Sequence, residues 1–134
     1  MNTRVAVVLR MVPMMVVMGT IFFLSHQPGD QLHLPQLPGI DKWAHLAAYG
    51  CLAATVLFAL SERQKSTSPY QMMGFTVSLC LLYGISDEFH QSFIVGRTAS
   101  IYDLLADGCG AALACAVWLK WRRKTPLGEF LRSR

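Results

Sequence analysis

Residues 72–93 read MMGFTVSLCLLYGISDEFHQSF, a continuous apolar run that closes on a group of polar side chains. Its length is close to the ~20 residues that a helix needs to cross ~30 Å of hydrocarbon. The apolar residues follow one another rather than alternate with polar ones, which disfavours a transmembrane strand. The run therefore predicts a membrane-spanning helix that carries Asp87, Glu88 and Gln91 in its last turns.

Three other stretches have a similar length and composition, residues 5–24, 42–60 and 101–121. The chain has 134 residues, of which 53% are apolar and only 15% charged, and the apolar residues come in long blocks. Cleavage of the first stretch as a signal peptide is disfavoured, because no small-x-small site follows Leu24. We therefore predict an all-α fold, one integral membrane domain over residues 1–134 built as a bundle of four transmembrane helices.

The distribution of basic residues predicts the orientation of this bundle. Of the twelve Lys and Arg residues, all except Lys42 and Arg97 lie near the N-terminus, in the second connection or in the C-terminal region. Connections rich in Lys and Arg stay in the cytoplasm, so both termini are predicted to be cytoplasmic, with residues 122–134 as a basic tail. This topology accounts for the net charge of +4 without nucleic acid as a partner.

Polar residues at the ends of three of the stretches are predicted to meet at the outer surface. A chain that crosses a membrane repeatedly puts the start of one span, the end of the next and the start of the following one on the same side. A carboxylate near mid-bilayer costs ~2.5 to 3.5 kcal/mol even on the lenient insertion scale, so these groups should turn inward to pair with bases or meet water. The residues are Asp41, Lys42, His45, Tyr49, Asp87, Glu88, Gln91, Arg97, Asp103 and Asp107.

This polar set has two interpretations, a functional site and a structural network. In a site, Arg97 and Lys42 would hold an anionic headgroup, and His45 and Glu88 would be the candidate acid and base of any reaction. In a network, the same groups would form buried salt bridges that fix the register of the helices. The acids outnumber the bases, which favours a site. The other ligand-binding candidates are Asp41, Tyr49, Asp87, Gln91, Asp103 and Asp107.

The sequence assigns no metal ligand and names no cofactor. It contains no Cys-x-x-Cys pair and no His-Glu-x-x-His spacing, and its carboxylates are too numerous for a simple zinc site. A divalent ion that bridges a lipid phosphate fits the carboxylates better than zinc does.

An ordered set of polar residues runs through the second, third and fourth stretches. It consists of Asp41-Lys42-x-x-His45-x-x-x-Tyr49, then Tyr83-Gly84-x-x-Asp87-Glu88-x-x-Gln91, then Gly96-Arg97, Ser100, Asp103, Asp107 and Gly110. This set resembles the signature of VanZ-like membrane proteins, and the resemblance covers residues 25–118. Val95 stands where the family often has proline, and Asp107 stands where many members carry asparagine.

The resemblance implies a small multi-pass protein of the bacterial cytoplasmic membrane. The namesake of the family is associated with low-level resistance to the glycopeptide teicoplanin. No known reaction follows from the resemblance, so whether the chain is an enzyme stays open. Position by position, it implies a functional surface made of Asp41, Lys42, His45, Glu88, Gln91, Arg97 and Asp103.

We expect a polar cavity on the outer side that binds or modifies an anionic envelope component, such as a lipid-linked or peptidoglycan precursor. Such a function would alter glycopeptide susceptibility. The alternative is a non-catalytic scaffold or partner-binding membrane protein. A proton or cation conduit is a weaker alternative, because no polar residue continues into the cytoplasmic halves of the spans. The lipid bilayer is the expected partner, and the sequence does not define an oligomeric state.

Overall fold

The computed structural model describes residues 3–29, 39–60 and 68–124. Within these ranges the chain forms four helices and no strand, α1 (Thr3–Ser25), α2 (Ile40–Ala59), α4 (Pro69–Gln91) and α5 (Ile101–Lys124). Each helix covers one of the four apolar stretches with ends shifted by a few residues, which confirms the all-α prediction. The predicted basic tail, residues 122–134, lies outside the described residues from residue 125 onward.

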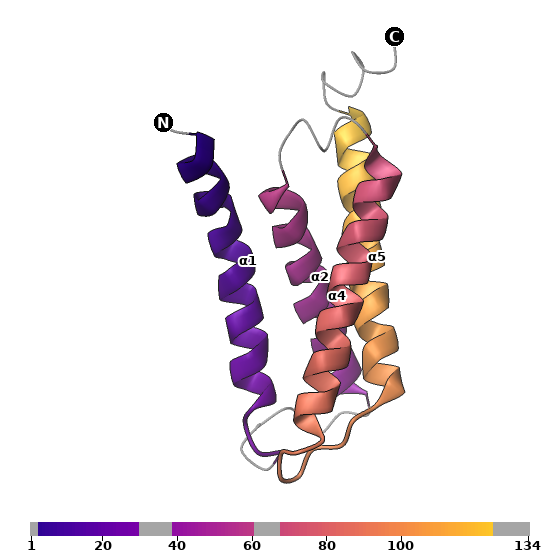
Figure 1. Cartoon of the computed structure of the whole chain (residues 1–134). Helices are drawn as coiled ribbons and strands as arrows, with labels where there is room; N and C mark the ends of the chain where they lie inside the picture. Colours follow the sequence, from indigo (N-terminus) through magenta and orange to yellow (C-terminus); the bar gives the residue numbers. More distant parts are fainter. Residues whose placement is uncertain (1–2, 30–38, 61–67, 125–134) are drawn as a thin grey trace.

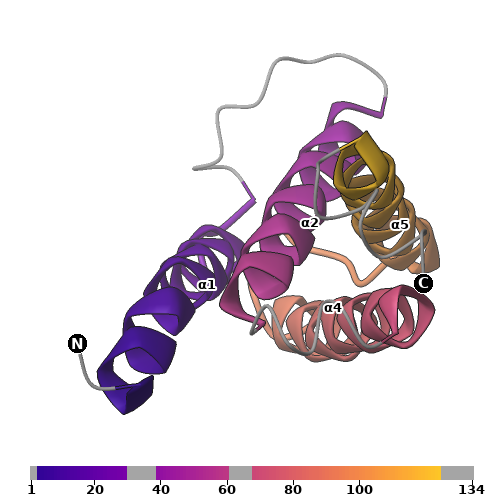
Figure 2. The same ribbon diagram turned by 90° about the horizontal axis from the view of Figure 1, so that it is seen from above.

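Successive helices run in opposite directions along the length of the molecule (Figure 1). The start of α1 and the end of α5 lie at one end, and the short segment that joins α4 to α5 lies at the other. We call the latter the polar end, because α2 and α5 begin there and α4 finishes there with its charged residues. Seen along the helices, α2, α4 and α5 form a group, and α1 stands outside it beside α2 (Figure 2).

Glycine makes the contact between α2 and α5 a very close one. A Cβ atom placed on Gly110 would lie 2.1 Å from the carbonyl oxygen of Leu46, and one on Gly50 would lie 3.4 Å from the carbonyl oxygen of Gly110. Small residues let two backbones approach in this way, a packing mode common in membrane helices. Leu46 and Gly110 lie in the first halves of α2 and α5, so the contact holds these halves next to each other near the polar end.

The core below the polar end is apolar and narrow. It contains Tyr49, Leu52, Ala53 and Val56 of α2, packed with Cys80 of α4, and Ile21 and Ala111 complete the cluster. The buried Thr76 satisfies its hydroxyl locally by donating to the carbonyl oxygen of Met72. The bundle interior therefore becomes apolar below the charged groups.

The outer surface of α1 is covered by large apolar side chains, including Val8, Met15, Val16 and Phe23. Two of the described helices, α1 and α5, contain segments long and apolar enough to cross a membrane, Val5–Ser25 and Ile101–Arg122. Exposed apolar surface of this kind needs a non-aqueous environment. The finding supports a membrane protein, while the four-span topology stays a prediction.

Candidate functional site

The polar end gathers the charged residues of three helices. Six of the predicted site residues are buried, which confirms that they turn into the bundle rather than toward its apolar outer surface. They are Tyr49, Asp87, Glu88, Gln91, Asp103 and Asp107.

His45 of α2 and Asp107 of α5 form the most deeply buried pair. The imidazole Nδ1 lies 2.9 Å from Asp107 Oδ1, and the Asp107 side chain has no exposed surface. Because a carboxylate accepts hydrogen bonds, Nδ1 donates and the other ring nitrogen, Nε2, is left for a further partner. The Tyr49 ring lies parallel to the imidazole, with centroids 6.2 Å apart.

Glu88 links the end of α4 to the start of α5. Its Oε2 accepts a hydrogen bond of 2.6 Å from the backbone N–H of Ser100, the residue that precedes α5. The positive end of the α5 dipole also stabilises a carboxylate at this position. Its other oxygen, Oε1, is buried and has no hydrogen-bond partner among the described residues.

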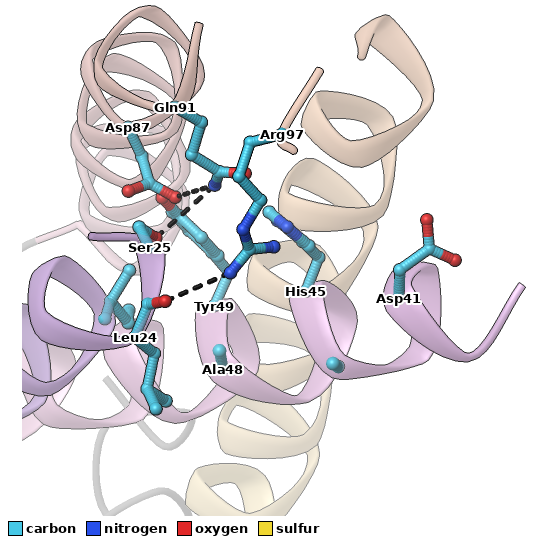
Figure 3. A pocket seen from close by; sticks show the side chains of 11 residues that line it. Leu24, Ser25, Asp41, His45, Ala48, Tyr49, Asp87, Gln91 and Arg97 are labelled. Carbon is cyan, nitrogen blue, oxygen red and sulfur yellow. Dashed lines mark hydrogen bonds between the residues drawn. The ribbon is translucent and has the colours of Figure 1, made fainter. Parts of the chain in front are cut away.

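Gln91 ties α4 to the end of α1. Its side-chain amide donates to Asp87 Oδ2 at 3.0 Å and to the hydroxyl of Ser25 at 3.3 Å. Figure 3 shows these contacts on one side of the site. Ser25 is a site residue that the sequence interpretation missed. One sequence feature could have identified Ser25: it directly follows the first apolar stretch, on the predicted side of the membrane that carries the carboxylates.

Lys42 holds two carboxylates at the rim of the polar end. Its ammonium lies 2.5 Å from Asp41 Oδ2 and 2.9 Å from Asp103 Oδ1, so it bridges α2 and α5. Asp41 and Lys42 are partly exposed, whereas Asp103 is almost completely covered. Two close carboxylates offset the single positive charge, which leaves Lys42 poorly suited to bind an external anion.

Arg97 contacts the end of α1. Its Nη2 donates to the carbonyl oxygen of Leu24 at 3.0 Å, and its Nε donates to that of Gln27 at 3.3 Å. The loops that carry these residues touch directly, since a Cβ on Gly29 would lie 2.1 Å from the carbonyl oxygen of Gly96. Gly96 has a φ of 75°, a conformation that glycine adopts without strain. The guanidinium keeps three N–H groups beyond these two contacts.

These residues surround a cavity of about 230 Å³ between α1, α2 and α4. Six of the predicted site residues line it, and Figure 3 shows Arg97 reaching across it toward Leu24. The other four, Lys42, Glu88, Asp103 and Asp107, do not line it and interact with one another or with His45 and Ser100. The lining also has an apolar part that the sequence interpretation missed, namely Ile21, Leu24, Ala44 and Ala48.

Three of the predicted residues stand where they could hold a cation together. His45, Asp87 and Glu88 each offer one ligand atom, and these atoms lie within 4.8 Å of one another. The sequence interpretation assigned no metal ligand, because the chain has no His-Glu-x-x-His spacing and its carboxylates are too numerous for a simple zinc site. The tertiary structure brings them together from α2 and α4.

The fold has two apolar helices that can cross a membrane, and a cavity with polar and apolar lining near the end where the buried charged residues gather. These features define the class of small helical membrane proteins with a buried polar site. The chain belongs to the VanZ/LLP1 family, whose family model matches residues 10–122. This match confirms the resemblance carried by the polar signature and extends it into α1. No curated protein and no solved structure matches the chain.

Proposed function

We propose that the protein crosses the bacterial cytoplasmic membrane four times, with both termini in the cytoplasm and the polar end on the outer side. The antiparallel order of the helices and the common end shared by the start of α1 and the end of α5 support this topology (Figure 1). The charge distribution supports it as well, since only Lys42 and Arg97 of the basic residues belong to the polar end. On this topology the cavity opens toward the outer leaflet.

In this position the cavity binds the anionic headgroup of an envelope component, such as a lipid-linked or peptidoglycan precursor. The observation that carries the proposal is its mixed lining. Arg97, with free N–H groups, stands opposite His45 and Asp87, while Ile21 and Leu24 of α1 add an apolar side. Guanidinium groups bind phosphate by paired hydrogen bonds, and an apolar flank suits the adjoining lipid chain. Binding of a precursor would change the access of glycopeptide drugs to the cell surface.

An enzymatic version of this function would use His45 and Glu88. The Asp107 carboxylate orients the imidazole and leaves Nε2 as the base, the arrangement that general-base catalysis requires. Glu88 keeps one unused oxygen, Oε1, in the same region. Binding and modification would therefore share one set of residues.

The test is the retention of anionic lipid by protein extracted from membranes in mild detergent and analysed by native mass spectrometry. Arg97→Gln should reduce the amount of bound anionic lipid about tenfold, since one charge-assisted contact of this strength is removed. Arg10→Gln is the matched control, because Arg10 lies in α1 far from the polar end, and it should retain lipid like the unchanged protein. Equal retention in both variants would rule out the headgroup site.

A scaffold function is favoured by a different observation. Lys42 with Asp103, Glu88 with Ser100, and Gln91 with Ser25 each join two segments of the fold. If assembly is the only role, neutral replacements in these pairs lower thermal stability in detergent, and cellular phenotypes follow protein abundance. Loss of lipid from Arg97→Gln protein of unchanged stability would exclude it. The apolar core below the polar end gives no support to a conduit.

A further inference from the structure

We infer that His45, Asp87 and Glu88 form a binding site for a divalent transition-metal cation, Zn²⁺ or Mn²⁺, at the edge of the cavity that His45 and Asp87 line. The inference has a second part, which rests on the proposed function and deepens it. In this part the bound cation, together with Arg97, supplies the positive charge that holds an anionic phosphate.

The geometry of the three residues is close to that of a bound ion. Their ligand atoms lie within 4.8 Å of one another. Tetrahedral ligands about 2.1 Å from one Zn²⁺ ion stand about 3.4 Å apart. Rotations of the side chains that move each ligand atom by up to about 1 Å would close the group around a cation.

The hydrogen bond of His45 prepares the imidazole for metal binding. Metal-binding histidines usually donate their second ring N–H to a carboxylate, which fixes the ring orientation and makes the other nitrogen more basic. Asp107 plays this part, because its Oδ1 accepts from His45 Nδ1 at 2.9 Å in a fully buried position. His45 Nε2 is therefore the ligand atom, and while the ion is bound it does not act as the general base of the enzymatic version.

Glu88 provides an independent indication of a missing partner. The residue is only 7% exposed, and its Oε1 is buried without a hydrogen-bond partner in the part of the chain that the structure describes. Its Oε2 is already occupied by the Ser100 N–H. Buried polar atoms are almost always satisfied, and a cation in the group would satisfy this one.

The local charge also favours a cation. Lys42 is engaged by Asp41 and Asp103, and the hydrogen bonds of Arg97 go to carbonyl groups of the α1 end rather than to a carboxylate. Among the described residues, Asp87, Glu88 and Asp107 lie around the single imidazole of His45. Three carboxylates this close repel one another, and a divalent ion offsets two of the charges.

The ligand types select the kind of metal. Imidazole favours transition metals over Mg²⁺ and Ca²⁺, and two carboxylates with one imidazole suit Zn²⁺ or Mn²⁺. The part of the chain that the structure describes offers three protein ligands in this group, so a tetrahedral ion would have one coordination position left for another ligand. His45 and Asp87 line the cavity, and a phosphate oxygen can take the open position from that side.

The first experiment uses the metal alone. The full chain is purified in detergent, treated with a chelator, equilibrated with Zn²⁺ or Mn²⁺ and desalted. Its metal content is then measured by elemental mass spectrometry. About one ion per chain should remain, and Zn²⁺ or Mn²⁺ should raise the Tm of the unchanged protein while Mg²⁺ does not. Absence of both effects in the unchanged protein would overturn the inference without recourse to any variant.

Variants then assign the ligands. Asp87→Asn and Glu88→Gln should each bind the metal at least tenfold more weakly, and Asp107→Asn should weaken it about 10- to 100-fold through His45. His90→Gln is the matched control, because His90 lies at the same end and pairs with His26 at 3.2 Å, outside the group. Metal lost in His90→Gln but kept in Glu88→Gln would place the ion on the histidine pair and contradict the inference.

The second part is separated from the proposed function by measuring retained anionic lipid before and after chelation. Retention that falls with chelation and returns with Zn²⁺ or Mn²⁺ supports a docking role of the ion. Lipid that stays bound after chelation, but is lost in Arg97→Gln, overturns that role and leaves the proposed function intact. One bound ion per chain without any anionic lipid supports the metal site and counts against the proposed function.

Discussion

At the scale of single residues, two neighbouring tyrosines differ in how their hydroxyl groups are satisfied. Tyr83 of α4 donates to the carbonyl oxygen of Met18 at 2.7 Å and so helps to hold α1. Tyr49 of α2 is completely buried, and its hydroxyl has no partner among the described residues. An unsatisfied buried hydroxyl costs stability, which suggests that the Tyr49 hydroxyl is kept for a ligand in the cavity it lines.

We therefore predict opposite outcomes for the two phenylalanine variants. Tyr83→Phe should lower the free energy of unfolding by about 1 kcal/mol, because a hydrogen bond is lost and the Met18 carbonyl is left without it. Tyr49→Phe should leave stability unchanged or raise it, while reducing lipid retention. Unfolding in a denaturing detergent titration measures the first effect. A clear loss of stability in Tyr49→Phe would show that its hydroxyl has a structural partner.

At the scale of helices, the site depends on how close α2 and α5 lie. Gly110 touches the backbone of Leu46, which lies one helical turn after Lys42 in α2. This contact fixes how far α2 and α5 are shifted along each other, and so places His45 opposite Asp107. In contrast, α1 is held near the polar end by side chains that reach its last turn and the residues after it, through Arg97 and Gln91. Residues of α1, α2 and α4 line the cavity. Figure 2 shows α1 outside the group formed by α2, α4 and α5.

Replacement of Gly110 by alanine should destabilise the bundle by on the order of 3 kcal/mol. The new Cβ would lie 2.1 Å from the Leu46 carbonyl oxygen and 3.1 Å from the Gly50 nitrogen, so two backbones must separate. Gly74→Ala in α4 is the matched control, because its Cβ would have nothing within 4 Å and alanine favours helix. Thermal unfolding in detergent compares the two. A Gly110→Ala protein as stable as the control would show that α2 and α5 do not pack as described.

At the scale of the whole molecule, the proposed orientation puts the polar end outside the cell. All candidate ligands would then face the compartment in which peptidoglycan precursors are displayed. The basic residues near the start of α1 and the end of α5 would stay in the cytoplasm, as the positive-inside tendency requires. Topology therefore decides whether the cavity can meet an envelope component at all.

Labelling of introduced cysteines tests this orientation. In a chain whose native cysteines are replaced by alanine, Thr98→Cys should react in intact cells with a maleimide that cannot cross membranes. Gln71→Cys should react only after lysis, because Gln71 is in the first turn of α4, at the opposite end of the molecule. Both positions are exposed, so burial does not limit either reaction. The reverse pattern would place the polar end in the cytoplasm and remove the basis of the envelope proposal.

The sequence by itself determined which segments are helical and where their charges gather. The length and composition of an apolar stretch are local properties of the sequence, and they predicted all four helices to within a few residues. The cost of exposing a carboxylate to lipid predicted that Asp87, Glu88, Asp103 and Asp107 would turn inward, as they do. The polar signature also identified the family correctly.

Only the tertiary structure decided which of these groups become partners. The sequence interpretation left Arg97 and Lys42 either to an external anion or to salt bridges. In the structure Arg97 bonds carbonyl groups at the end of α1, and Lys42 is held by Asp41 and Asp103. Such pairs depend on the rotation of each helix about its axis and on its shift along the neighbouring helices. Contacts between segments far apart in the chain set both quantities, as the contact of Gly110 with Leu46 does. The spacing of residues within one helix carries no information about them.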